Sequence, residues 1–158
     1  MLRLRPYKIE DADIIITWSK DEQVFYQWSA GIMGEYPLTQ EKFRFVESLM
    51  AFTAFDENEI VGFFTLRNPG GMIDELRMGF VIVDPSQRGR GKGKEMLELG
   101  LRYAFDVYGA KKVSLGVFEN NEPAYYCYKA AGFKDVNEIE TYKILDEEWK
   151  CAEMAIER

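Results

Sequence analysis

Apolar and polar positions along the 158-residue chain predict alternating strands and helices within one domain. Strand-like runs rich in β-branched residues are expected at 2–5, 51–55, 60–66, 72–83, 112–118 and on both sides of a turn at 145–147. Helical spacing of apolar residues is expected after 11, over 21–28, after 39, over 96–108 and over 124–131. This order predicts a mixed α/β (α+β) fold over 1–158. Its central sheet, mostly antiparallel, would have about seven strands, with helices on both faces.

Helix ends give more local predictions. Asp11 or Asp13 is expected to cap the first helix, because a short carboxylate can accept the free N–H groups of a first helical turn. The segment that begins at Thr39 is expected to be helical and to present Met50 to the core. The runs 51–55 and 60–66, joined by four polar residues, predict a β-hairpin.

One stretch, 80–94, joins a β-rich run to a glycine-dense basic turn and then to an amphipathic segment. Interpreted as strand, loop and helix, it leaves backbone N–H groups unpaired at the helix N-terminus, where the helix dipole favours an anion. Glycines at 89, 91 and 93 have no Cβ, so a ligand can approach the backbone closely. The stretch therefore predicts a phosphate-binding site. Four basic residues add positive charge around it: Arg88, Arg90, Lys92 and Lys94.

The spacing excludes two common phosphate loops. Lys94 is followed by Glu95, whereas a Walker loop needs Ser or Thr there, and the glycines do not fit the dinucleotide fingerprint. An Arg/Gly tail that binds nucleic acid is an alternative, which the flanking strand and helix disfavour. Following Val83, the run Arg88-x-x-Gly91-x-Gly93 instead resembles the acetyl-coenzyme A loop of the GNAT superfamily of N-acetyltransferases.

A second pattern lies about thirty residues further along the chain. Asn121-x-x-Ala124-x-x-x-Tyr128-x-x-x-Gly132-Phe133 also resembles GNAT enzymes, in the order that the superfamily requires. The closing part, 142–154, resembles most the branch that includes the ribosomal-protein N-terminal alanine acetyltransferases. The resemblance extends along the whole chain and implies the GNAT fold and an acyltransferase that uses acetyl-coenzyme A.

The resemblance also implies site residues. A strand would pair its backbone with the pantetheine arm, the glycine loop would cradle the pyrophosphate, and an asparagine would bind the pantetheine region. These cofactor-binding residues would be Val81, Ile82, Val83, Arg88, Gly89, Arg90, Gly91, Lys92, Gly93 and Asn121. The hydroxyl of Tyr128 would lie near the thioester sulfur. Two simpler roles are left open: Asn121 as a helix cap and Tyr128 as a packed core residue.

The chain contains no histidine, which excludes Ser-His-Asp and Cys-His catalysis and histidine-containing zinc sites. We therefore expect direct attack by an amine on the thioester, with no covalent enzyme intermediate and no metal. Some relatives place a catalytic glutamate where this chain has Gly116. Glu75 is the candidate general base, acting directly or through a water, and Glu119 and Glu35 are the alternatives.

The acceptor is expected to bind against the early helices with their loop and against the last hairpin. Trp28, Glu35 and Tyr36 could line that site, with aromatic walls and one negative charge for an amine. A peptide N-terminus, a polyamine, an aminoglycoside and a small amine are all left open as acceptors. A non-catalytic acyl-coenzyme A sensor on the same fold is the alternative function.

The composition of the chain limits the classes of molecule that it is expected to bind. The net charge of −7 and the sequence pI of about 4.8 disfavour binding to nucleic acid and suit a cationic acceptor. The N-terminal residues do not resemble a signal peptide and no apolar run approaches membrane-spanning length, so we expect a cytoplasmic protein that does not bind membranes. The two cysteines are too few for a disulfide scaffold. Homodimerisation is left open.

Overall fold

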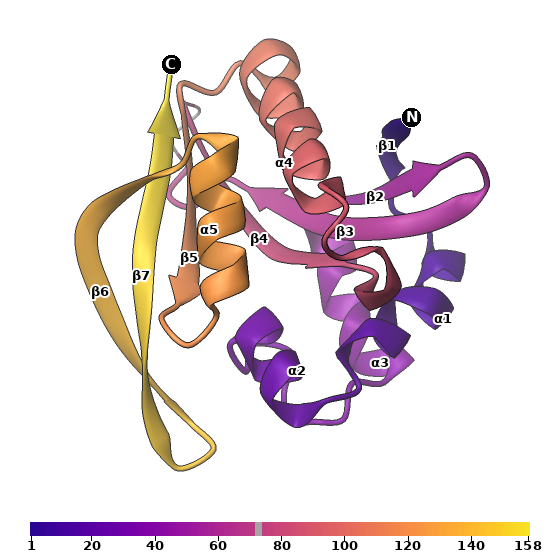
Figure 1. Cartoon of the computed structure of the whole chain (residues 1–158), viewed down its shortest axis with the longest axis vertical. Coiled ribbons are helices and arrows are strands. Elements are labelled where there is room, and N and C mark those ends of the chain that lie inside the picture. Colours follow the sequence, from indigo (N-terminus) through magenta and orange to yellow (C-terminus); the bar gives the residue numbers. More distant parts are fainter. Residues whose placement is uncertain (72–73) are drawn as a thin grey trace.

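The computed structural model describes residues 1–71 and 74–158, and these form one seven-stranded sheet (Figure 1). The strands are β1 Leu2–Pro6, β2 Met50–Asp56, β3 Glu59–Arg67, β4 Glu75–Val83, β5 Lys112–Phe118, β6 Lys134–Ile144 and β7 Glu147–Glu157. They lie in the order β1-β2-β3-β4-β5-β7-β6. The β4–β5 pair is parallel and the other described pairs are antiparallel, which confirms the expected mixed sheet. Residues 72–73 of the predicted strand 72–83 lie outside the described residues.

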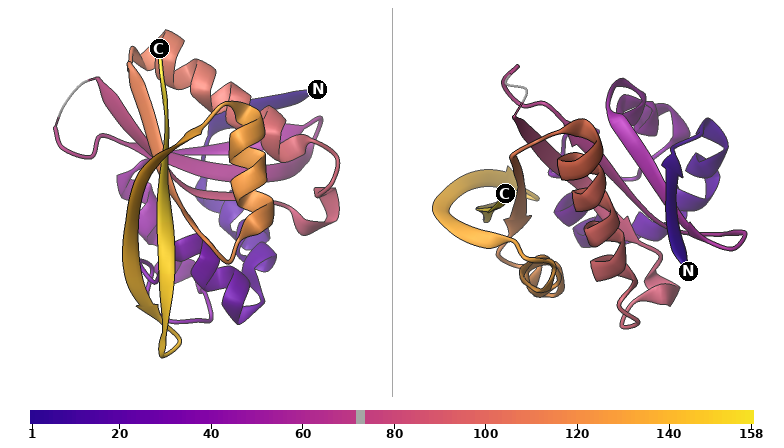
Figure 2. Two further views of the ribbon diagram at one scale, coloured as in Figure 1. Left: turned by 60° about the vertical axis from the view of Figure 1, so that its left-hand side comes forward. Right: turned by 90° about the horizontal axis from the view of Figure 1, so that it is seen from above.

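Helices cover both faces of this sheet (Figures 1 and 2). They are α1 Ala12–Ile15, α2 Glu22–Ser29, α3 Gln40–Phe43, α4 Lys92–Arg102 and α5 Glu122–Ala131. Successive strand residues point to opposite faces, so Phe64 packs in the core beneath α4 and α5, whereas Phe63 packs in the core beneath α1–α3. No helix in the described part of the chain is both long and apolar enough to cross a membrane.

Two local predictions are wrong. Met50 does not extend the helix after Thr39: α3 is a single turn, a 3₁₀ segment Arg44–Ser48 follows it, and the backbone is extended at Leu49. Met50 is instead the first residue of β2, because β1 and β3 provide hydrogen-bonding partners on both edges of this β-rich run. Neither predicted aspartate caps α1 with its side chain: Asp13 accepts a hydrogen bond from the Gln40 amide, and Asp11 is used elsewhere.

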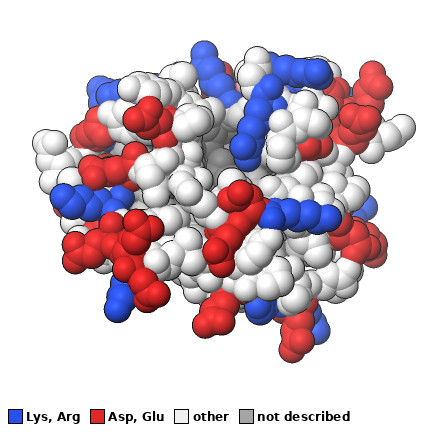
Figure 3. Space-filling view, turned by 60° about the horizontal axis from the view of Figure 1, so that its bottom comes forward, with Lys and Arg blue, Asp and Glu red and all other residues white. Residues whose placement is uncertain are grey.

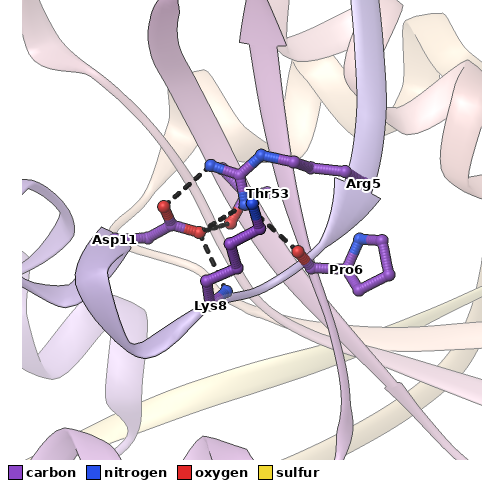
Figure 4. A network of polar contacts seen from close by, with 5 residues as sticks. All are labelled: Arg5, Pro6, Lys8, Asp11 and Thr53. Atoms are coloured by element: carbon purple, nitrogen blue, oxygen red, sulfur yellow. Dashed lines mark hydrogen bonds and ion pairs between the residues drawn. The ribbon is translucent and has the colours of Figure 1, made fainter.

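Asp11 is the centre of a buried polar network that fastens the first helices to the sheet (Figure 4). Its two carboxylate oxygens each accept a hydrogen bond from the Arg5 guanidinium, both at 2.8 Å. The Thr53 hydroxyl on β2 and the Lys8 backbone N–H donate to the same carboxylate at 2.8 and 3.0 Å. Burial would raise the pKa of Asp11, but these hydrogen bonds favour the charged form more strongly and the pKa is lowered.

We expect Asp11→Ala to lower the free energy of unfolding by about 3 kcal/mol, because it leaves the half-buried Arg5 without its partner. A lowered folded-state pKa stabilises the fold above the unfolded-state pKa of about 4. This contribution is therefore lost as the pH falls below that value. Urea unfolding at pH 7 and pH 3 measures both effects, with exposed Asp13→Ala as the control. Equal stability of Asp11→Ala and Asp13→Ala at pH 7 would contradict the prediction.

β4 and β5 separate part-way along their length. They pair from Glu75 to Arg77 and then diverge, and the described residues form no further β4–β5 pair. At the point of divergence, Arg77 on β4 donates to both carboxylate oxygens of Glu153 on β7, at 2.7 and 2.6 Å. Gly116 on β5 makes room for this pair, because a Cβ there would lie 3.1 Å from Arg77 and 2.8 Å from the Cys151 sulfur. This ion pair joins the two halves of the sheet where the strands part.

Candidate functional site

A groove of about 560 Å³, here called the central groove, occupies the gap between the diverging strands. Its walls are β4 and β5, from which residues 78–83 and 115–117 face one another. The loop before α4 closes one end, α5 lines one side, and Val24, Gln27 and Trp28 of α2 lie across the opposite side. The central groove therefore collects segments that are far apart in the sequence.

A β-bulge shapes the β4 wall of this groove. Ile82 pairs with Phe63 and Gly79 pairs with Thr65, so Phe80 and Val81 together oppose the single residue Phe64. Phe80 has a φ of 51°, which a non-glycine residue rarely adopts. Because β5 has already separated, the backbone of 81–83 has no ladder partner on its groove side within the described residues. Val81, Ile82 and Val83 thus present an unpaired strand edge to the groove.

The glycine loop follows β4 and leads into α4. Gly89 and Gly91 have φ values of 78° and 75°, in the left-handed region that favours glycine, and Gly91 is the residue at the helix N-cap. A Cβ on Gly93 would lie 3.1 Å from the Cys127 sulfur, so this glycine lets α4 approach α5. The loop residues that line the central groove include Arg88, Gly89, Gly91, Lys92 and Gly93, whereas Arg90 is not among them.

The Lys92 side chain forms an ion pair with Asp56 at 2.8 Å, and the Asp56 carboxylate also accepts from the Met1 ammonium. The hydrogen bond to Asp56 raises the pKa of Lys92. The positive charge of Lys92 is therefore balanced within the fold, which leaves its backbone N–H at the start of α4 as the group that could contact an anion.

α5 brings two predicted residues into the central groove. Asn121 lines it and also caps the helix, since its side-chain oxygen accepts from the Ala124 N–H at 3.4 Å. Tyr128 is buried in the groove wall with its ring against Phe133. Burial raises the pKa of the Tyr128 hydroxyl, so this group is protonated at neutral pH. The half-buried Cys127 lines the groove as well.

Three other predicted site residues do not reach the central groove. Glu75 lies at the far end of β4, six residues from Val81, a distance on the order of 20 Å along the strand. Its carboxylate accepts a hydrogen bond from the Ser114 hydroxyl. Glu35 is an exposed loop residue. The Tyr36 hydroxyl donates to the Lys20 carbonyl, and its ring packs against Phe25. Of the predicted acceptor-binding residues, the structure brings Trp28 to the groove.

Sequence reasoning missed the α2 wall apart from Trp28. Val24 and Gln27 lie four and one positions before Trp28, so a helical face drawn through Trp28 includes Val24. The Gln27 amide donates to the Asn120 carbonyl at 3.1 Å and joins α2 to the loop before α5. No aspartate or glutamate is among the described residues that line the groove.

The sequence model of the Acetyltransferase (GNAT) family matches residues 13–133, which span the strands, loop and helices of the central groove. The chain belongs to the GNAT acetyltransferase family. This match confirms the GNAT superfamily that the two sequence patterns predicted, and the fold agrees with it.

Solved GNAT structures share the fold across the whole chain. A spermidine N-acetyltransferase from Vibrio cholerae in complex with CoA and spermine superposes with a TM-score of 0.82 and is 18% identical, covering 99% of this chain and 95% of that one. An aminoglycoside acetyltransferase in complex with coenzyme A has a TM-score of 0.75, also at 18% identity, covering 100% and 95%. At these identities the likeness shows the fold alone.

Curated GNAT relatives match over shorter segments. A mycothiol acetyltransferase from Corynebacterium glutamicum (strain R) is 35% identical over 79 residues, which is 50% of this chain and 26% of the relative. A spermine/spermidine N(1)-acetyltransferase from Bacillus subtilis (strain 168) is 33% identical over 58 residues, or 37% and 38%. The chain thus spans between a quarter and two fifths of these relatives. None of these named proteins supports the predicted ribosomal-protein branch specifically.

Proposed function

We propose that this GNAT domain transfers an acetyl group from acetyl-coenzyme A to a primary amine within a ternary complex. The observation that carries the proposal is the joining of three elements in one groove: an unpaired strand edge, a left-handed glycine loop at a helix N-terminus, and a buried protonated tyrosine. The edge at 81–83 suits the amide groups of a pantetheine arm, which would add to the sheet as a strand does. The start of α4 suits the pyrophosphate.

The chemistry is a direct displacement at the thioester. The neutral amine nitrogen attacks the acyl carbon, and the carbonyl electron pair moves to the oxygen and returns as the carbon–sulfur bond breaks. Tyr128 donates its proton to the departing thiolate, and it regains one from the solvent. The proton lost from the amine goes to water, because no carboxylate is among the described groove residues.

We expect Glu75→Gln to retain nearly full turnover, because Glu75 lies outside the central groove and is bonded to Ser114. The pH dependence of kcat/KM should follow the pKa of the acceptor amine and shift when the acceptor is changed. Thiol release from acetyl-coenzyme A between pH 6 and pH 10, with two amines of different pKa, measures both effects. A large loss of kcat in Glu75→Gln would restore Glu75 as the base.

We propose a cationic amine, of the polyamine class, as the acceptor. The net charge of −7 favours a cationic substrate. Acidic side chains gather in patches, between basic and uncharged ones, on the face that carries α2 and the β6–β7 turn (Figure 3). Two similar proteins are named as acting on spermine or spermidine. A peptide N-terminus, an aminoglycoside and a small monoamine remain as comparison acceptors.

Isothermal titration with acetyl-coenzyme A, followed by a thiol-release assay over these acceptors, tests the function. We expect micromolar binding and release that depends on the acceptor, fastest with spermidine or spermine. Binding without release from any acceptor would favour the acyl-coenzyme A sensor. Absence of binding would overturn the assignment of the glycine loop.

A further inference from the structure

Gln27 brings an amide group to the wall that α2 contributes to the central groove. The other two residues of this wall are aliphatic and aromatic, Val24 and Trp28. The Gln27 side chain is half-buried, and the hydrogen bonds of its amide are exposed to solvent. A ligand in the groove can therefore reach this amide.

The partner of the Gln27 amide determines its orientation. Gln27 Nε2 donates to the backbone carbonyl oxygen of Asn120 and to its side-chain oxygen, both at 3.1 Å. A backbone carbonyl can only accept, so the amide nitrogen must face Asn120 and the amide oxygen must face away from that carbonyl. No hydrogen bond from the described residues reaches the Gln27 oxygen. The amide thus keeps an unused acceptor in a fixed orientation.

The other side-chain amide oxygens of the groove are used or lie elsewhere. Asn120 accepts from Gln27, and Asn121 accepts from the N–H of Ala124 at the start of α5. Gln87 belongs to the 3₁₀ turn Pro85–Gln87 that precedes the glycine loop, at the end proposed for the phosphates. Gln27 therefore provides the unused amide oxygen of the α2 wall.

α2 bridges the two segments proposed to hold the pantetheine arm. Trp28, the residue after Gln27, packs edge to face against Phe80, with the ring centroids 6.3 Å apart, and Phe80 directly precedes the strand edge at 81–83. Asn120, the partner of Gln27, directly precedes Asn121. The proposed cofactor contacts belong to the other walls of the groove, so the α2 wall is left for the acceptor.

The chemistry of the reacting groups determines what this oxygen can bind. Among the described residues that line the groove, the charged side chains are all basic: Arg88, Lys92 and Lys94. An acceptor amine thus finds a neutral oxygen on the α2 wall in place of a carboxylate. The amine offers N–H donors, and its single lone pair forms the new bond. Its nitrogen gains positive charge during the attack, so a hydrogen bond from its N–H to an amide oxygen becomes stronger.

We propose that the Gln27 side-chain oxygen accepts a hydrogen bond from an N–H of the acceptor amine and directs the nitrogen lone pair towards the thioester. This inference rests on the proposed acetyltransferase function. The amide oxygen takes no proton: the nitrogen electron pair forms the bond to the acyl carbon, the carbon–sulfur bond breaks, and the surplus proton on nitrogen passes to water. Asn120 is a positioning residue, because its backbone carbonyl fixes the orientation of the Gln27 amide.

Steady-state kinetics of Gln27→Met test the inference, because methionine keeps the length of the side chain and removes the amide. We expect kcat/KM for spermidine to fall by about 10-fold or more, as for a lost hydrogen bond to a group that becomes charged. The dissociation constant for acetyl-coenzyme A should be unchanged. The matched control is Gln23→Met, because Gln23 lies one helical turn earlier on α2, is exposed and does not line the groove. Thermal unfolding shows that both variants are folded.

Binding of the acceptor gives a second readout that needs no turnover. Isothermal titration of spermidine into protein saturated with coenzyme A forms a complex with no acyl group to transfer. Ammonium and neutral amine groups both carry N–H donors, so Gln27→Met should weaken spermidine binding by about 5-fold. Gln23→Met should bind spermidine as the wild type does.

Three results would overturn the inference while the proposed function stands. The first is wild-type kcat/KM in a folded Gln27→Met variant, and the second is an equal loss in Gln23→Met. The third is a loss of acetyl-coenzyme A affinity in Gln27→Met, which would place the amide on the pantetheine arm. If the wild type itself releases no thiol with any acceptor, the proposed function fails and the inference fails with it.

Discussion

Replacing Tyr128 by phenylalanine should lower kcat by about 100-fold and leave the affinity for coenzyme A unchanged. Burial keeps the pKa of this phenol above its ordinary value, so the hydroxyl is protonated and can supply a proton to the leaving thiolate. Phenylalanine retains the ring and its edge-to-face contact with Phe133, so the variant removes the proton donor with little loss of packing.

Steady-state thiol release and isothermal titration measure these two quantities separately. Tyr126→Phe is the matched control, because Tyr126 lies on the same helix but is 65% exposed. We expect this control to have wild-type kcat and affinity. Unchanged kcat in Tyr128→Phe would show that the thiolate leaves without help from the tyrosine, whereas a loss of coenzyme A affinity would indicate a binding role.

Gly91→Val should weaken the binding of coenzyme A by about 100-fold or more, because it removes about 3 kcal/mol or more of the interaction with one helix N-terminus. Gly91 has a φ of 75°, and a β-branched residue there costs conformational energy. A Cβ on Gly91 would meet no other described residue within 4 Å, so the added side chain would occupy open space beside the start of α4, where the pyrophosphate is proposed to lie. Titration of the folded variant with coenzyme A measures the loss.

Gly109→Val controls for backbone strain alone. Gly109 has a φ of 92°, ends the π-helical segment Tyr103–Tyr108 and does not line the central groove. Both variants should lose stability, but only Gly91→Val should lose affinity. Equal affinities for the two variants would mean that the glycine loop does not hold the phosphate groups.

The parts of the site that the sequence predicts are those with a local cause. The glycine loop and the start of α4 depend on φ angles and free N–H groups within a few residues, so glycine spacing locates them. Asn121 is similar, because a helix cap is read from adjacent residues. Tyr128 is implied by the resemblance to GNAT enzymes, and it lies on the helix that Asn121 caps.

The parts that the sequence does not predict depend on strand pairing. Glu75 and Val81 belong to one strand, and only the place where β5 separates shows which end lines the groove. The bulge at Phe80 exists because of its register against β3. Met50 has both helical and strand-like neighbours, and its pairing with Leu66 of β3 decides its state. Long-range contacts of this kind leave no signal in nearby residues.

The parting of β4 and β5 gives an interior strand the properties of an exposed edge. Successive N–H groups along β4 point alternately towards β3 and towards the gap. Amides of 81–83 that point to β3 should exchange with solvent deuterium slowly, and their neighbours, one residue away, should exchange quickly. A single strand at the centre of the sheet would thus show two time scales of exchange in the unliganded protein. A ligand bound in the gap would slow the exchange of the amides that point into it, so that the two time scales would become similar.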